Sequence, residues 1–260
     1  MSIPPIRTLA RRLAGWRECG ALPEPIDPRD RPISAAGLPT TPPPERLPRH
    51  GLPPLYQAGN SCTGRAVHGV RIALKLRDRD PGELSGLHNY RLSRILAGLA
   101  DWDMGSYNRE AVRAIAKFGC APASMWPEVY ANVQRNPPPT VQRAAHKLSG
   151  VRGYYRLSND LDEWRRVLAS DHAIVAAFYL AKPFMSSSGP ETVDVGELDR
   201  NGPGHALVID GYDRSRFHSP ASWRGWRGTR FVEAGCWFTE RAIVEHARDS
   251  WALIFDPEAS

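Results

Sequence analysis

The chain has 260 residues, of which 42% are hydrophobic and 24% charged, with a formal net charge of +6. This length allows a sizeable core in one domain, or in one domain built from two lobes. No apolar run approaches the roughly 18 residues needed to cross a membrane. The N-terminus lacks the apolar stretch and the small-residue cleavage site of a secretory signal. We therefore expect a cytoplasmic protein without a membrane span, and leave open export or injection by a route other than Sec.

The first part of the chain, residues 1–54, is rich in proline. Half of the 24 prolines fall within residues 1–53. Proline fixes its own φ and biases the preceding residue away from helix, so Pro23–Pro54 is predicted to be extended and irregular. Apolar residues at 6, 9, 13 and 16 predict one short amphipathic helix before it. We expect residues 1–54 to be an arm that wraps the surface or tethers the chain, with coverage of a cleft as the alternative.

The second part, residues 55–150, shows the hydrophobic spacing of helices. Two helices are predicted at about 62–76 and 86–100. A third is predicted from Asn108, as N-cap, to a stop at Gly119, and a short fourth from a Thr140 cap to residue 145. We interpret this part as a helical lobe.

The third part, residues 151–260, is rich in strand patterns. Strands are predicted at 153–157, 173–180, 205–212, 229–233 and 251–255. Helices are predicted after a Ser158 cap and at 239–248, and a long loop at 182–203. A helical front part and a strand-rich back part predict an α+β fold of two lobes with a cleft between them.

The four cysteines are widely separated, and no C-x-x-C pair occurs. A zinc site or a disulfide framework is therefore not predicted, and we expect no metal or organic cofactor. Cys62 differs from the other three because it follows Gly59-Asn60-Ser61, where a loop ends and a helical pattern begins. Free N–H groups and the helix dipole at such a position favour a thiolate. The alternative is a small core residue at the start of a helix.

His205 is the second candidate for chemistry. Asn201-Gly-Pro-Gly204 precedes it and an apolar strand follows it, so the imidazole is expected at the mouth of a strand. A structural histidine is the alternative. A cysteine and a histidine in these two settings together make a functional role more favourable than either residue does alone.

Several segments carry a further pattern. Pro53-Pro-Leu-Tyr-Gln57 is followed by Ser61-Cys62, and later segments read Gly204-His-Ala-Leu-Val-Ile-Asp-Gly-Tyr212 and Ser222-Trp-Arg-Gly-Trp-Arg-Gly228. In this order they resemble the P-x-x-x-Q…S-C entry, the H-A-x-x-x-x-G-Y strand and the N-S-W-G-x-x-W-G run of papain-like (family C1) cysteine peptidases. The segment from Asp103 to Pro127 resembles the divergent bacterial and phage branch of that family. His205 also follows Cys62 at the family's spacing of roughly 130–150 residues.

The resemblance implies a papain-like fold: a helical lobe, then a β-rich, barrel-like antiparallel lobe, with the active cleft between them. It implies Cys62 as nucleophile, His205 as base, Gln57 as oxyanion donor and Trp223 as a shield for the histidine. The family's histidine-orienting Asn is replaced here by Ala221. The remaining candidates for orienting His205 are Ser219, Ser222, His218 or a backbone carbonyl.

Two smaller departures from the family pattern concern the nucleophile segment. Gln57 stands five residues before Cys62, where the family usually has six. Arg65 replaces the apolar or aromatic residue expected in the helix after the nucleophile.

The resemblance leaves the function open in one respect. A working hydrolase of peptide or amide bonds is favoured, because nucleophile, base and oxyanion donor are all retained. The alternatives are a catalytically impaired fold used for binding or assembly, and a deamidase or acyltransferase. A protein or peptide substrate is expected. Nucleic acid is not expected as a partner, since base-stacking motifs, zinc knuckles and long basic runs are missing from the sequence.

Overall fold

The computed structural model describes residues 19–38, 41–47, 57–75, 84–147, 151–181, 192–220 and 235–255. The helix predicted near the N-terminus and the strand predicted at 229–233 lie outside these residues. None of the helices within the described ranges is long and apolar enough to cross a membrane.

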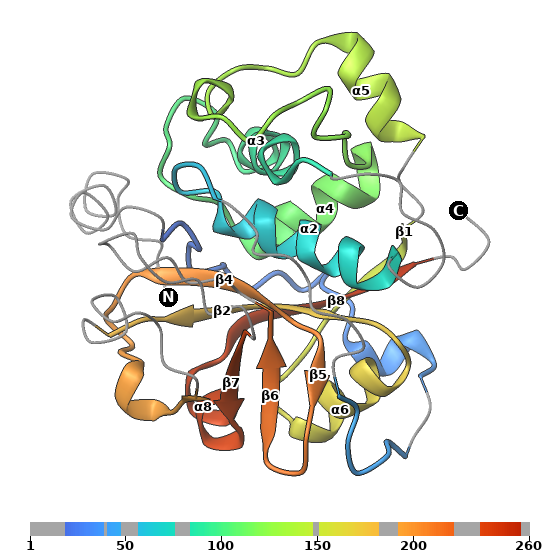
Figure 1. The fold of residues 1–260 in the computed structure, drawn as a ribbon, viewed down its shortest axis with the longest axis vertical. Helices are drawn as coiled ribbons and strands as arrows, with labels where there is room; N and C mark the ends of the chain where they lie inside the picture. The colour runs from blue at the N-terminus through green and yellow to red at the C-terminus, as the bar shows by residue number, and fades with distance from the viewer. Residues whose placement is uncertain are drawn as a thin grey trace.

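The helical lobe forms the upper half of the molecule in Figure 1. Its helices are α2 (Cys62–Lys75), α3 (Gly86–Leu96), α4 (Asn108–Phe118) and α5 (Pro139–His146), with a 3-10 turn η2 (Tyr130–Asn132). All four predicted helices are confirmed, but two caps are not. Tyr107 is the N-cap of α4, and α5 begins at Pro139, whose fixed φ suits the first turn. Gly119 ends α4 with a φ of 72°, as predicted.

The β-rich lobe contains two four-stranded sheets. The first has the order β1 (Val151–Arg156), β8 (Arg248–Phe255), β2 (Ile174–Tyr179), β4 (Gly204–Ile209). The second has the order β3 (Thr192–Val193), β7 (Cys236–Thr239), β6 (Arg216–Ser219), β5 (Gly211–Tyr212). The other elements are α6 (Leu161–Ala169), η3 (Val195–Glu197) and α8 (Glu240–His246). All described pairings are antiparallel except β3 with β7. The described strands therefore form two open sheets rather than the barrel-like lobe that was expected.

Local details of this lobe differ from the sequence prediction. The predicted strand at 205–212 is divided at Asp210 into β4 and β5, and strands β6 and β7 were not predicted. Asp160, and not Ser158, caps α6 through the backbone N–H of Asp162. Thr239 caps α8, but this helix ends at His246 and β8 begins at residue 248, inside the predicted helix.

The two lobes meet along an apolar interface. The helices α2 and α4 lie on one face of the β1-β8-β2-β4 sheet (Figure 1). Buried residues of this interface are Cys62, Val67, Val70, Val112, Ile115, Val175, Ala177, Ala206, Val208, Trp251 and Leu253. The opposite face of the sheet packs into a second core within the β-rich lobe, which includes Trp164, Phe178, Phe217 and Phe238. Burial on both faces makes the first sheet the centre of the molecule.

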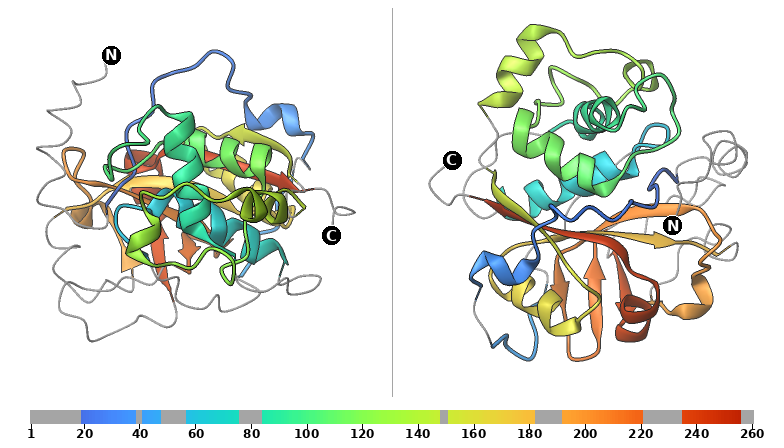
Figure 2. Two further views of the ribbon diagram at one scale, coloured as in Figure 1. Left: turned by 90° about the horizontal axis from the view of Figure 1, so that it is seen from above. Right: turned by 180° about the vertical axis from the view of Figure 1, so that it is seen from behind.

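The described part of the N-terminal arm is bound along its length. Figure 2 shows it passing between the lobes before it runs over the β-rich lobe. Ile33, in a 3-10 turn η1 (Ile33–Ala36), is 5% exposed and packs into the β-lobe core. Further along, Arg46 and Tyr212 exchange two backbone hydrogen bonds of 2.9 and 2.8 Å. These contacts hold the described part of the arm against the β-rich lobe.

Candidate active site

Cys62 is the first residue of α2, as predicted. The loop before it turns at Gly59, whose φ is 62°, and a Cβ at Gly59 would lie 2.6 Å from Asp103 Oδ2. Only glycine fits this turn without strain. Asn60 continues the loop and donates from Nδ2 to the Asp103 carbonyl (2.7 Å) and from its backbone N–H to Asp103 Oδ1 (3.3 Å). The nucleophile loop is therefore tied to the segment at 103–106.

Tyr90 of α3 supports the same connection from inside the helical lobe. Its hydroxyl donates to Asp103 Oδ1 (2.7 Å) and accepts from the backbone N–H of Gly105 (3.0 Å). Burial, followed by the nearby charge of Asp103, raises the pKa of Tyr90 well above its usual value, so the hydroxyl keeps its proton. Asp103 and Tyr90 thus hold two loops side by side at the edge of the helical lobe.

His205 lies near the start of β4, on the other lobe. It is 7% exposed and stands opposite Phe178 of β2 in the register of the sheet. The next residue, Ala206, packs in the same apolar cluster as Cys62. Its backbone N–H is also among the groups that favour the Cys62 thiolate. The fold therefore brings the segment of the candidate base against the candidate nucleophile.

The N-terminal arm covers Cys62. The backbone N–H of Gly20 donates to Cys62 Sγ at 3.2 Å, and the thiol is 1% exposed. The following residue, Ala21, donates its N–H to the carbonyl of Gly204 (3.0 Å), immediately before His205. The arm thus lies between the nucleophile and the strand that carries the histidine.

On the other side, the arm pairs with the loop of the helical lobe. Ser106 donates its N–H to the Gly20 carbonyl (2.8 Å) and accepts at its own carbonyl from the N–H of Leu22 (2.9 Å). Ala21 and Ser106 form a parallel β-bridge. Residues 20–22 are therefore held as a short extended strand by main-chain groups of both lobes.

Three glycines make this close approach feasible. A Cβ at Gly20 would lie 2.0 Å from the Asn60 carbonyl oxygen. A Cβ at Gly105 would lie 2.0 Å from the Gly20 oxygen, and one at Gly204 would lie 2.0 Å from the Ala21 oxygen. At these three positions, the arm and the segments on either side of it pack too closely to leave room for a side chain.

The electrostatic state of Cys62 differs from the sequence prediction. Burial under the arm raises the pKa of the Cys62 thiol, and backbone N–H groups, with Ala206 and Gly20 foremost, only partly oppose this. The helix start was predicted to favour the thiolate. Because a charged sulfur loses its water when the arm is seated, desolvation outweighs the helix dipole.

Other candidates from the sequence are placed as follows. Gln57 lies in the nucleophile loop and donates from Nε2 to the Gly59 carbonyl (3.0 Å). Ser219 is buried at the end of β6, opposite Cys236 of β7. Ala221, Ser222 and Trp223 lie outside the described residues.

Arg65, a departure from the family pattern, has a structural explanation. Its side chain is 5% exposed and lies 3.6 Å from Glu128 Oε1, and the same Glu128 oxygen accepts from the N–H of Leu87 at the start of α3 (2.9 Å). The positive charge is buried with a carboxylate partner that joins α2, α3 and the loop at 128.

His218, one of the candidates for orienting His205, forms a buried pair with Asp210, a residue that the sequence did not single out. Nδ1 of His218 is 2.7 Å from Asp210 Oδ1, and both side chains are less than 10% exposed. The His218 ring packs edge-on against Trp237. Asp210 occupies the break between β4 and β5, so this pair fixes the turn of the chain from the central sheet into the second sheet. Asp210 lies inside the strand predicted at 205–212, a position that gave no signal for this pair.

All four cysteines are buried, and none of them forms a disulfide. Within the described ranges, no group of three His, Cys, Asp or Glu side chains is placed to hold a metal ion.

The two-lobed α+β architecture is that of papain-like cysteine proteases. Among solved structures, xylellain, a cysteine protease from Xylella fastidiosa, is similar with a TM-score of 0.76 and 21% identity. The match covers 92% of this chain and 97% of that one.

Two further solved structures show the same fold. Digestive procathepsin L2 from Tenebrio molitor matches with a TM-score of 0.67 and 18% identity over 94% of this chain and 80% of that chain. The cysteine protease and lectin-like domains of Cwp84 from Clostridium difficile match with a TM-score of 0.64 and 16% identity, over 97% and 60%. No protein-family model and no curated protein sequence matches the chain. At these identities the similarity shows the fold.

Proposed function

We propose that the protein is a cysteine peptidase that cleaves polypeptides bound in extended form across the cleft between its lobes. Cys62 is the nucleophile and His205 the base that takes its proton and returns it to the leaving amine. Gln57 and the backbone N–H of Cys62 stabilise the oxyanion. The roles of Cys62, His205 and Gln57 follow from the family resemblance, and the packing of β4 against the start of α2 supports them.

One observation supports a polypeptide as the substrate. The cleft holds a stretch of main chain through the Gly204 carbonyl and through both polar groups of Ser106, directly beside Cys62. These groups recognise backbone, not side chains, which is the way in which proteins bind extended peptides. A small amide has no strand to offer them. This favours a polypeptide over a free amide as substrate for the same Cys–His chemistry.

The arm itself is bound as an inhibitor. Cys62 Sγ accepts a hydrogen bond from the Gly20 N–H, so the sulfur faces an amide nitrogen and not a carbonyl carbon. The carbonyl of Gly20 is directed to the Ser106 N–H instead. The arm therefore takes the binding groups of the cleft without presenting a scissile bond to the nucleophile, and we infer that it keeps the peptidase latent.

Hydrolysis of unfolded, fluorescently labelled casein by the full-length protein tests the proposal. Cys62→Ala is expected to abolish turnover and His205→Ala to reduce it by at least about 10³-fold, since both act in the chemical step. Cys120→Ala is the matched control, because Cys120 is another buried cysteine of the helical lobe and the variant is expected to keep the activity. Equal turnover in Cys62→Ala contradicts the mechanism. Accessible Cys62 without turnover of any polypeptide supports the alternative of a binding module.

A further inference from the structure

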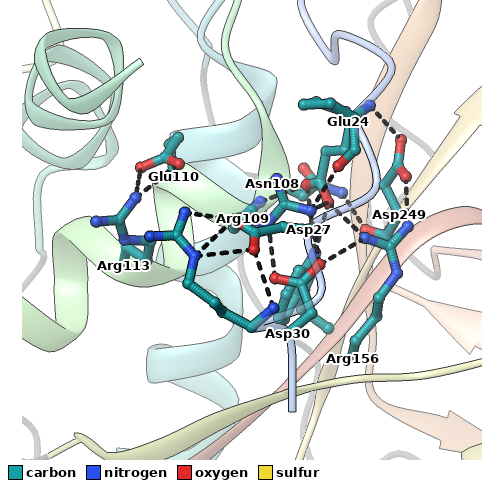
Figure 3. Close-up of polar contacts among 12 residues, drawn as sticks. Glu24, Asp27, Asp30, Asn108, Arg109, Glu110, Arg113, Arg156 and Asp249 are labelled. Atoms are coloured by element: carbon teal, nitrogen blue, oxygen red, sulfur yellow. Dashed lines mark hydrogen bonds and ion pairs between the residues drawn. The ribbon is translucent and has the colours of Figure 1, made fainter. Parts of the chain in front are cut away.

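The arm is anchored, just beyond the cleft, by a buried carboxylate. The side chain of Glu24 is fully buried and lies at the start of α4 (Figure 3). Its oxygens accept from the indole Nε1 of Trp251 (3.2 and 3.1 Å) and from the backbone N–H of Arg109. The arm thus supplies a carboxylate to the N-terminus of α4, whose N-cap Tyr107 gives no side-chain hydrogen bond.

Two guanidinium groups connect Glu24 to two other carboxylates. Arg156 of β1 lies 3.3 Å from Glu24, 3.1 Å from Asp30 of the arm and 3.0 Å from Asp249 of β8. Arg109 of α4 binds Asp30 at 2.6 Å and lies 3.9 Å from Glu24. Three buried carboxyl groups therefore share two guanidinium groups. With all three ionised the cluster carries an excess negative charge away from water, which favours the uptake of a proton.

Glu24 is the site at which that proton is bound most readily. Burial, and then the charge of Asp249, raise the pKa of Glu24 from 4.5 to about 8, against the opposing effect of Arg109 and Arg156. Burial also raises the pKa of Asp249. Both shifts have the same cause, since the seated arm removes water from the cluster.

Other charged or titratable groups surround the cluster without replacing its members. On α4, Glu110 is paired with Arg113 at 2.9 Å, and on the arm Asp27 is paired with Arg29 at 2.6 Å. Three more groups complete the surroundings, and their charges or protons interact electrostatically with Glu24, Asp249 or both: Tyr107, Tyr179 and Arg248. Burial raises the pKa of Tyr107, and it raises that of Tyr179 to about 12, so both phenols stay neutral over the range considered below.

Glu24 lies only a few residues along the chain from the segment that covers the nucleophile. Only Pro23 separates Glu24 from Leu22, which is bonded to Ser106 in the cleft. The backbone N–H of Glu24 also donates to Asp249 Oδ2 at 3.0 Å. Displacement of Glu24 from the cluster therefore pulls on the strand that covers Cys62.

We propose that Glu24 is a proton-dependent latch, which holds the arm on Cys62 while its carboxyl group is protonated and releases it as that group ionises toward alkaline pH. The regulatory meaning of the latch rests on the proposed function, but arm opening is measurable without any substrate. A carboxyl group whose pKa is about 8 when docked and 4.5 when exposed binds its proton more tightly in the docked state. Docking is then at full strength below pH 4.5, weakens by up to tenfold per pH unit above it, and levels off above pH 8. Between pH 6 and pH 8 the arm is expected to open about 50-fold more often.

The test is the rate of Cys62 alkylation by iodoacetamide in the full-length protein, followed by peptide mass spectrometry from pH 5.5 to 8.5. Glu24→Gln copies the shape of the protonated group and does not ionise. Because the thiolate of the open state is common to both proteins, the ratio of wild-type to Glu24→Gln rates removes the ionisation of the thiol itself. We expect this ratio to rise about 50-fold from pH 6 to pH 8. Glu245→Gln, an exposed substitution on α8, is the matched control and is expected to follow the wild type.

Asp249→Asn provides a second variant with a separate signature. Asp249 has a φ of 47°, a conformation that asparagine also adopts readily, so the backbone is preserved. Removing its charge lowers the pKa of docked Glu24, so the rise in alkylation is expected to begin at the same pH as in the wild type but to level off at lower pH, with a smaller total increase. A ratio that stays constant with pH, an unshifted profile in Asp249→Asn, or no alkylation of Cys62 at any pH overturns the latch. Strong pH-dependent opening without casein hydrolysis supports the latch and contradicts the peptidase.

Discussion

Substitution of Gly20 by alanine is the most direct perturbation of the covered cleft. The added Cβ would lie 2.0 Å from the Asn60 oxygen and 2.9 Å from the Asn60 Cβ. The obstacle is the nucleophile loop, which is held by Asp103 and cannot retreat easily. Gly20 does not have a left-handed φ, so alanine meets no backbone strain there. The expected result is a folded protein whose arm no longer fits over Cys62.

The size of the effect follows from the contacts that are lost. Four hydrogen bonds hold the strand: Gly20 to Cys62 Sγ, Ala21 to Gly204, Leu22 to Ser106, and Ser106 to Gly20. At about 1 kcal/mol of net stabilisation each, their loss costs about 4 kcal/mol of docking free energy. This corresponds to an increase of about 10³-fold in the open population.

Alkylation of Cys62 at a fixed pH of 7 measures this population. Gly196→Ala is the matched control, because nothing lies within 4 Å of a Cβ at that position. Alkylation of Gly20→Ala within twofold of the wild-type rate would refute the reasoning, since steric exclusion of the arm would then not control access to the thiol.

Three further predictions concern stability and catalysis. Burial lowers the pKa of His88 from 6.5 to about 4, so the native state prefers the neutral ring. The free energy of unfolding is therefore expected to fall by up to about 3 kcal/mol as pH falls from 6.5 to 4. Urea denaturation at pH 7 and at pH 4.5 should show a smaller loss in His88→Leu than in the wild type. Ala221→Asn is expected to raise kcat for casein with KM unchanged, and an unchanged kcat means that another group already orients His205. Ile33→Ala is expected to cost about 2–4 kcal/mol in thermal unfolding, because the side chain is buried in the β-lobe core; a loss below 0.5 kcal/mol would show that the arm is dispensable for stability.

The helices could be predicted because each buries one regular stripe of its own residues. The run from Cys62 to Val70 repeats at helical spacing, and Gly119 marks the end of α4, although the N-cap of α4 is Tyr107 and not the predicted Asn108. Strands β6 and β7 escaped prediction because each has only four residues. Such short strands are stabilised by their neighbours in the sheet, and not by a pattern of their own.

In the candidate site, too, the local features could be predicted and the contacts between distant residues could not. Cys62 and His205 stand in local settings, a helix start and a strand start, that the sequence displays directly. The seating of the arm depends on contacts among Gly20, Gly105 and Gly204, which are far apart in the chain. The sequence around Gly20 does not indicate the backbone that packs against it, and the sequence around Glu24 does not indicate the arginines that surround it. These relations exist only after the lobes have come together.

The way in which the arm is fastened determines what kind of inhibitor it is. Ile33 in the β-lobe core and the backbone pairing of Arg46 with Tyr212 keep the arm attached when residues 20–22 leave the cleft. Reclosure is then intramolecular, at a high effective concentration, and needs no second molecule. Because the arm uses the same main-chain groups as a polypeptide substrate, the two compete for one cleft. Such competition raises KM by the ratio of closed to open molecules and leaves kcat unchanged. Wild type and Gly20→Ala are therefore expected to reach the same rate at saturating casein and to differ in KM, whereas an arm that also distorted the catalytic groups would lower kcat.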